Sequence, residues 1–232
     1  MGFNLLDIEC INKKNLQIAL THPSYTTENN ISYLKNYERL EFLGDAVLKL
    51  ITSDLLYKKY PEYKEGKLSK IRSILVSDNT LATIAKDIKL QEKMILGKGE
   101  EHTGGRDRES NIACTMEAIL GAYYLDGKIN YIERFLNENL LPLSNEIDMH
   151  FEKYNAKAVL QEYTQKENNT LPKYTTTNIT GPMHNPKFEV EVSYNNKILA
   201  IGYGNNKKEA QQNGAYKACV KLGIISGDTK NE

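Results

Sequence analysis

Apolar residues recur at helical spacing through the first two thirds of the chain. Positions three or four apart share one face of a helix, so this pattern predicts helices rather than strands. The longest such segment stops before Pro61, because proline lacks the amide hydrogen that a helix interior needs. Residues 97–108 are rich in glycine and charge and predict an exposed loop. The helices expected are residues 13–20, 36–60, 66–76, 79–88, 110–125 and 131–140, which make an all-α domain over residues 1–146.

The pattern changes beyond residue 155. Residues 156–166 and the segment from Lys207 onward keep helical spacing, whereas residues 187–194 alternate apolar and polar side chains as a strand does. Asn195 and Asn196 are suited to a tight turn between two strands. The strands expected are residues 173–180, 187–194 and 197–203; between two helices they predict a small α+β domain (α-β-β-β-α) over residues 156–225.

Charge also separates these two parts. Residues 1–155 carry 20 Lys and Arg against 23 Asp and Glu, whereas residues 156–225 carry nine Lys against five Glu. The whole chain has 30 of each sign, a balance that predicts no partner by itself. Between the domains we expect a polar linker at residues 147–155, and after them a disordered tail at residues 226–232.

Composition gives evidence on the cellular compartment of the protein. No apolar run approaches the roughly 20 residues that cross a bilayer, so we expect no membrane association. Cys10, Cys114 and Cys219 are odd in number and form no CxxC pair. This usage argues against a disulfide scaffold or a structural zinc site and favours a reducing compartment. We therefore expect a cytoplasmic protein.

Carboxylates gather on one side of the helix expected at residues 36–60. Glu38, Glu41 and Asp45 lie within about 60° of one another on a helix, because each residue turns by 100°. Stacked negative charges weaken a helix unless a cation lies among them, and Mg²⁺ prefers carboxylate oxygens. The helix expected at residues 110–125 offers Glu117 as a further ligand. A solvated acidic face, in a helical dimerisation protein, is the competing interpretation.

Short motifs in both parts of the chain resemble those of a known protein family. ERLEFLGDAVL, at residues 38–48, resembles the signature helix of the ribonuclease III family. The resemblance extends to THPSY (residues 21–25), EGKLS (65–69), RSILVS (72–77) and TMEAILGA (115–122). LQEY (160–163), GPMHNPKF (181–188) and KKEA (207–210) resemble a double-stranded-RNA-binding domain. The motifs follow the order and spacing of the family over almost the whole chain.

The resemblance implies a homodimeric endonuclease that hydrolyses double-stranded RNA with Mg²⁺, for which Mn²⁺ can substitute, and without an organic cofactor. It implies 5′-phosphate and 3′-hydroxyl products and a role in rRNA and mRNA processing. The metal ligands of the family fall on Glu41, Asp45 and Glu117, of which Asp45 and Glu117 are catalytic. Glu38 and Glu65 match auxiliary acids of the active-site valley.

One position departs from the family. Cys114 stands where the family usually carries an Asp, three residues before Glu117. A thiol is a poor ligand for Mg²⁺, and losing even an outer metal partner costs roughly 10–100-fold in affinity or activity. Cys114 therefore predicts either an enzyme with an altered metal requirement or a catalytically silent RNA-binding regulator.

The signature helix also carries predictions about packing. The resemblance implies that Phe42 packs across the dimer interface; an ordinary core Phe is the competing interpretation. Gly44 and Gly121 would let the two acid-bearing helices approach closely, because glycine has no side chain.

The basic second part has candidates for three RNA contacts. A reader of duplex RNA works by shape, across about 16 base pairs. We expect side chains of its first helix in one minor groove, a loop in the next, and a lysine pair on the phosphates. The family often has another Lys at Gln211, so we expect a weakened phosphate contact. The candidate residues are Gln161 and Glu162 on the helix, His184 in the loop, and Lys207 and Lys208.

Overall fold

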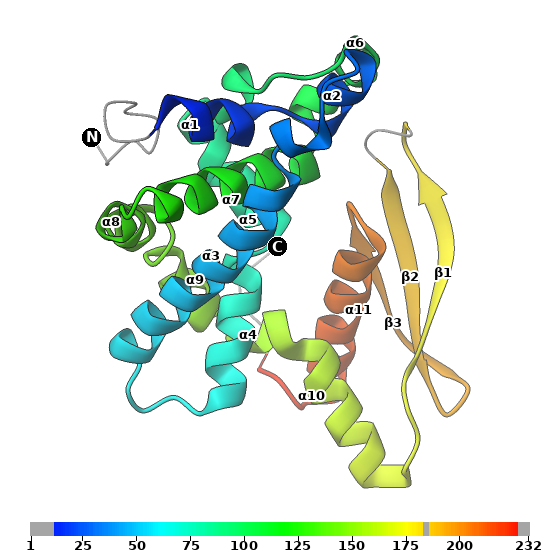
Figure 1. Ribbon diagram of the computed structural model, residues 1–232. Coiled ribbons are helices and arrows are strands. Elements are labelled where there is room, and N and C mark those ends of the chain that lie inside the picture. Colours follow the sequence, from blue (N-terminus) through cyan, green and yellow to red (C-terminus); the bar gives the residue numbers. More distant parts are fainter. Residues whose placement is uncertain (1–11, 183–185, 227–232) are drawn as a thin grey trace. The chain divides into compact units, whose positions relative to one another are not determined.

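The computed structural model describes residues 12–182 and 186–226 (Figure 1). The chain divides into two compact units, residues 1–148 and residues 149–232. His184 and Cys10 lie outside the described residues, as does the tail from residue 227. None of the helices in the described ranges is long and apolar enough to cross a membrane.

Helices build the described part of the first unit, as the periodicity predicted. All six expected helices are present, and the bounds of the first match the prediction at both ends. They are α1 (Lys13–Leu20), α3 (Glu38–Lys59), α4 (Glu65–Leu75), α5 (Asp78–Asp87), α7 (Glu109–Leu125) and α8 (Ile129–Asn139). Not expected were α2 (Pro23–Glu28), α6 (Lys98–His102), α9 (Leu143–Met149) and the 3₁₀ turns η2 (Tyr33–Lys35), η3 (Leu90–Lys93) and η4 (Gly105–Asp107).

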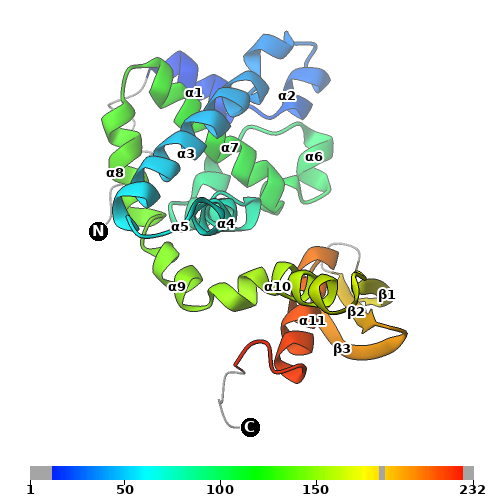
Figure 2. The same cartoon turned by 90° about the horizontal axis from the view of Figure 1, so that it is seen from below.

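The core of the first unit surrounds α7. This helix is apolar on most of its sides, and Ile112, Met116, Ile119 and Tyr123 are all buried. A helix that is apolar all round is stable only when other elements cover it. Helices α3 and α5 both pack against α7, and Figures 1 and 2 show α3 crossing α7 at an angle.

Backbone contact sets the spacing of α3 and α7. A side chain at Gly44 would overlap the carbonyl group of Glu117, and one at Gly121 would overlap the carbonyl oxygen of Leu40. The expected close approach of these two helices is therefore confirmed. It brings the acidic positions of α3 next to those of α7.

The expected loop at residues 97–108 is partly wrong. Five of its residues form α6, and the short turn η4 follows. The carboxylate of Glu28 accepts hydrogen bonds from the backbone N–H groups of Lys98 (2.6 Å) and Gly99 (2.9 Å) at the start of α6. Because Glu28 is about 70 positions away in the sequence, local composition could not predict this stabilisation.

The segment expected as a linker is largely helical. Helix α9 runs through Met149 and α10 (Phe151–Asn168) begins two residues later, so α10 starts earlier than its predicted first residue, Ala156. The boundary between the two compact units falls between Asp148 and Met149.

The second unit is the expected α+β fold. Strands β1 (Lys173–Thr180), β2 (Lys187–Tyr194) and β3 (Lys197–Gly204) form an antiparallel sheet in the order β1-β2-β3, between α10 and α11 (Lys207–Lys221). Asn195 and Asn196 have φ of 50° and 60°, as the tight turn between β2 and β3 requires. Leu160 of α10, Val192 of β2 and Cys219 of α11 are buried together in the core of this unit.

Candidate active site and nucleic-acid interface

Helices α3 and α7 carry the three expected metal ligands, Glu41 and Asp45 on α3 and Glu117 on α7. Gly44 touches the backbone of Glu117; Asp45 directly follows Gly44, and Glu41 lies three residues before it on α3. The charges of Asp45 and Glu41 both raise the pKa of Glu117, as nearby carboxylates do. All three side chains are partly buried at this contact.

The charge state of Glu117 reflects this crowding. Burial first, and then the charges of Asp45, Glu41 and Asp78, raise the pKa of Glu117 to about 8, against an opposing effect of Lys49. An ordinary Glu has a pKa near 4.5. Glu117 is therefore largely protonated at pH 7 until a cation compensates the negative charges around it.

Cys114 lies close to the same carboxylates. Burial raises the pKa of its thiol well above the usual range; a hydrogen bond to Glu41 and the charges of Glu41, Glu117 and Asp78 raise it further. The Cys114 side chain therefore remains a neutral thiol. It occupies the expected place beside Glu117 but supplies no anionic ligand.

The acids do not form a finished coordination shell. Asp45 Oδ2 lies 2.7 Å from Nζ of Lys49, one helical turn away; the Asp45 side chain is 39% exposed and that of Lys49 is 51% exposed. Within residues 12–182 and 186–226, no group of three or more His, Cys, Asp or Glu side chains is already arranged to hold a metal ion. An exposed ion pair of this kind contributes only about 0–1 kcal/mol, so a divalent ion could displace Lys49.

The two auxiliary acids differ in their surroundings. Glu38 begins α3, and its Oε2 accepts a hydrogen bond from Asn36 Nδ2 at 3.2 Å. Glu65 begins α4, where its carboxylate accepts a hydrogen bond from Ser69 Oγ at 2.7 Å on the same helix. Glu38 therefore lies on the helix of the main acids, whereas Glu65 is held locally on α4.

Two residues of the site were not expected from the sequence. Asp78 is the first residue of α5, directly after the capping Ser77, and its charge reaches both Glu117 and Cys114. Tyr37 is only 5% exposed, and its pKa is raised by burial and then by Cys114, Glu41, Glu38 and Glu100. Tyr37 therefore keeps a neutral phenol beside the carboxylates. The available signal was its position directly before the signature helix.

Four of the expected RNA-binding residues lie within the described ranges, all on exposed positions of the second unit. Gln161 and Glu162 project from α10, and Lys207 and Lys208 form the first turn of α11. Asn206 caps this helix by accepting a hydrogen bond from the N–H of Glu209 at 2.8 Å. Free N–H groups together with lysine charge make such a helix start attractive to phosphate.

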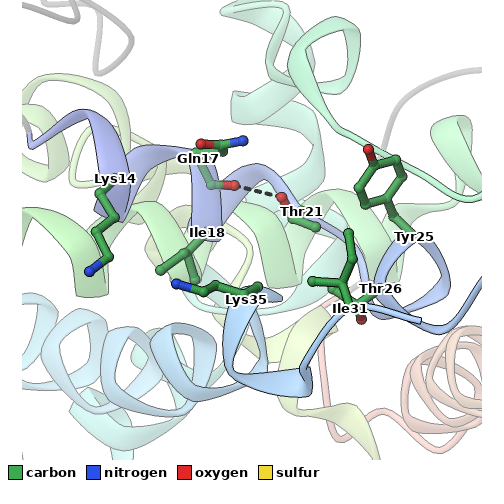
Figure 3. Close-up of a pocket in the computed structure, with 8 residues that line it drawn as sticks. All are labelled: Lys14, Gln17, Ile18, Thr21, Tyr25, Thr26, Ile31 and Lys35. Carbon is green, nitrogen blue, oxygen red and sulfur yellow. Dashed lines mark hydrogen bonds between the residues drawn. The ribbon is translucent and has the colours of Figure 1, made fainter. Parts of the chain in front are cut away.

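A hollow elsewhere in the first unit is separate from the acids. It has a volume of about 250 Å³ and lies between α1, α2 and the segment around η2 (Figure 3). Its lining contains no carboxylate. The lining residues are Lys14, Gln17, Ile18, Thr21, Tyr25, Thr26, Ile31 and Lys35.

Comparison with known proteins matches both units. A family described as Ribonuclease-III-like matches residues 12–143, and the double-stranded RNA binding motif matches residues 156–222. Ribonuclease 3 of Streptococcus uberis is 43% identical over 216 residues, which cover 93% of each chain. Ribonuclease 3 of Bacillus licheniformis is 39% identical, covering 94% of this chain and 87% of its own. The nuclease domain of ribonuclease III from Campylobacter jejuni superposes with a TM-score of 0.52 and 34% identity, covering 60% of this chain and 90% of its own.

Paired acidic helices followed by a duplex-RNA-binding fold define an endoribonuclease of double-stranded RNA. The chain belongs to the ribonuclease III family, as its matched length and identity show. Nucleases of this family require a divalent metal. The alternative of a silent RNA-binding regulator is not favoured.

Proposed function

We propose that this enzyme uses Mg²⁺, or Mn²⁺ in its place, and that Glu41, Asp45 and Glu117 hold the ion. The supporting observation is the raised pKa of Glu117 among neighbouring carboxylates. The donor set fits the ion, because Mg²⁺ binds carboxylate oxygens and retains several waters. Bound there, the ion would lower the pKa of an attacking water and neutralise charge on the phosphate.

The residues of the chain have distinct parts in this proposal. Glu117 would hold the ion as a carboxylate and would give up its proton to do so, since its pKa without metal is about 8. Asp45 forms an ion pair with Lys49 and would give up that pair to hold the ion. Glu41 accepts a hydrogen bond from the Cys114 thiol, which keeps that thiol directed into the site. Glu38 and Glu65 act as auxiliary acids, and hydrolysis leaves 5′-phosphate and 3′-hydroxyl ends.

Cys114 sets the metal requirement in this proposal. Its neutral thiol replaces a negative oxygen, so the site attracts a divalent ion less strongly than one with Asp would. We expect activity at raised Mg²⁺ concentration or with Mn²⁺.

A second copy of the chain completes the proposed enzyme. Phe42 is 82% exposed, which shows that the interpretation of it as a core residue is wrong. Leu50 and Tyr57, also on α3, are 64% and 73% exposed. These three residues lie within about 80° of one another around the helix. We propose that this apolar face of α3 packs against its equivalent in a homodimer.

The proposed setting is the cytoplasm, with rRNA and mRNA precursors as substrates. Cys114 and Cys219 are both free thiols, as a reducing compartment requires. RNA recognition by the second unit uses Gln161 and Glu162, the loop that contains His184, and the lysine pair Lys207 and Lys208.

Cleavage of a long RNA duplex across Mg²⁺ and Mn²⁺ series tests this function. The parent protein should cut the duplex but not a single strand of the same sequence, and Glu117→Gln should bind the duplex without cutting it. If no metal supports cutting by the parent, the hydrolytic site is refuted. Equal loss of cutting and binding in Glu117→Gln would assign Glu117 to folding rather than to metal.

A further inference from the structure

Lys157, on α10, is not among the residues expected from the sequence to bind RNA. Its Nζ lies 2.6 Å from Oε1 of Gln211 on α11 and 4.7 Å from the ring centre of Tyr174 on β1. Three elements of the second unit therefore hold one ammonium group. Unlike a free surface lysine, Lys157 has its position set by the fold.

This ammonium lies beside the expected phosphate contact. Gln211 follows Lys208 by three residues, so the two share one face of α11. Burial, and then the charge of Lys208, lowers the pKa of Lys157, which shows that the two ammonium groups are near each other. On α10, Gln161 lies one turn beyond Lys157 on the same side. Lys157 therefore links the two helix surfaces expected to contact RNA.

The charge of Lys157 is available to a ligand. Gln211 is neutral and accepts one hydrogen bond, whereas an ammonium group has three to donate. Within residues 12–182 and 186–226, no carboxylate forms an ion pair with Lys157, Lys207 or Lys208. Two like charges held together without a counter-ion, in a unit with an excess of lysine, fit a polyanionic ligand.

We propose that Lys157 is a third phosphate-binding cation of this unit, positioned by Gln211 and Tyr174, so that α10 as well as α11 contacts the RNA backbone. The expected weakening of the phosphate contact at Gln211 is then compensated, because Gln211 holds a lysine from the other helix. This inference rests on duplex-RNA binding by the second unit.

Salt dependence of binding separates a phosphate contact from a structural role. Affinity for an RNA duplex of about 20 base pairs would be measured over a KCl series, with the full chain carrying Glu117→Gln so that no cutting occurs. Each lost phosphate contact lowers the slope of log affinity against log salt by about 1. We expect Lys157→Gln to show this loss, with affinity about 3–10-fold weaker at moderate salt, and Lys157→Arg to keep the slope.

Two further variants make the result decisive. Lys221→Gln is the matched control, because Lys221 is an exposed lysine in the last turn of α11, and it should leave the slope unchanged. Gln211→Glu retains Lys157 but places an anion on it, and should also lower the slope. It keeps the test valid if Lys157→Gln lowers the melting temperature.

An unchanged slope in both Lys157→Gln and Gln211→Glu refutes the inference. Weaker binding with an unchanged slope also refutes it, because that pattern assigns Lys157 to packing alone. If the parent protein does not bind the duplex, or binds it without salt dependence, the premise that this unit binds the RNA backbone is refuted, and with it the proposed function of the unit.

Discussion

Replacing Glu117 by Gln should stabilise the metal-free protein, and increasingly so as the pH rises. The pKa of Glu117 is raised from 4.5 to about 8 in the folded protein. A carboxyl group with a raised pKa contributes stability that is fully present below its unfolded value and is lost as the pH rises through its folded value. Because Gln carries no charge at any pH, the variant avoids this loss between pH 4.5 and 8.

The size of the effect follows from the shift. A difference of about 3.5 pKa units, at 1.36 kcal/mol per unit, sets a ceiling of about 5 kcal/mol. Glu117 is only partly buried and solvent screens its neighbours, so we take about 2 kcal/mol as the expected gain. For a chain of this size that corresponds to about 4–8 °C in melting temperature.

The measurement is a pair of calorimetric melting series, parent and Glu117→Gln, from pH 5 to 9 with a metal chelator present. The two proteins should melt together at pH 5 and diverge toward pH 9, with the variant higher. Adding Mg²⁺ at pH 8 should reverse the order, because only the parent retains the third ligand. If the difference in melting temperature between the two proteins does not change with pH, burial and neighbouring charges do not raise the pKa of Glu117, and the reasoning is refuted.

Three other substitutions test separate parts of the proposal. Cys114→Asp should lower the Mg²⁺ concentration for half-maximal cleavage by about 10-fold; an unchanged titration would show that this position does not influence the metal. Phe42→Asp should convert a dimer to a monomer in analytical ultracentrifugation, whereas Ile198→Asp, at another exposed apolar position, should not; a Phe42→Asp dimer would reject the α3 interface. Gly44→Ala should lower the free energy of unfolding by about 3 kcal/mol, because the added methyl overlaps the Glu117 carbonyl. Its control, Gly66→Ala, meets open space on α4 and should stabilise the protein by about 0.5–1 kcal/mol in the same urea titrations; equal effects would contradict the close helix contact.

Most of the fold was predictable because its main signals are local. Helical spacing identified α1, α3 and α7, and strand alternation with an Asn-Asn turn identified β2 and β3. Short helices escaped prediction because distant groups support them, as Glu28 supports the first turn of α6.

The candidate site, like the fold, was predictable from the sequence only where its signals are local. Glu41, Asp45 and Glu117 were found from their positions on helices, and the Asp45–Lys49 pair could have been found from its i,i+4 spacing. Asp78 and Lys157 could not, because their neighbours belong to other helices and the sequence does not show how those helices pack. The degree of burial that raises the pKa of Glu117 is likewise a property of the packed helices.

The contact between Gly44 and the Glu117 backbone has a consequence for protein engineering. Main-chain atoms fix the separation of α3 and α7, so exchanging acids, amides or thiols on their facing sides changes ligand chemistry on a constant scaffold. A combinatorial library at positions 41, 45, 114 and 117 should therefore yield folded variants with different ion preferences. Positions 44 and 121 should be left out of such a library, since any side chain there would force the scaffold apart.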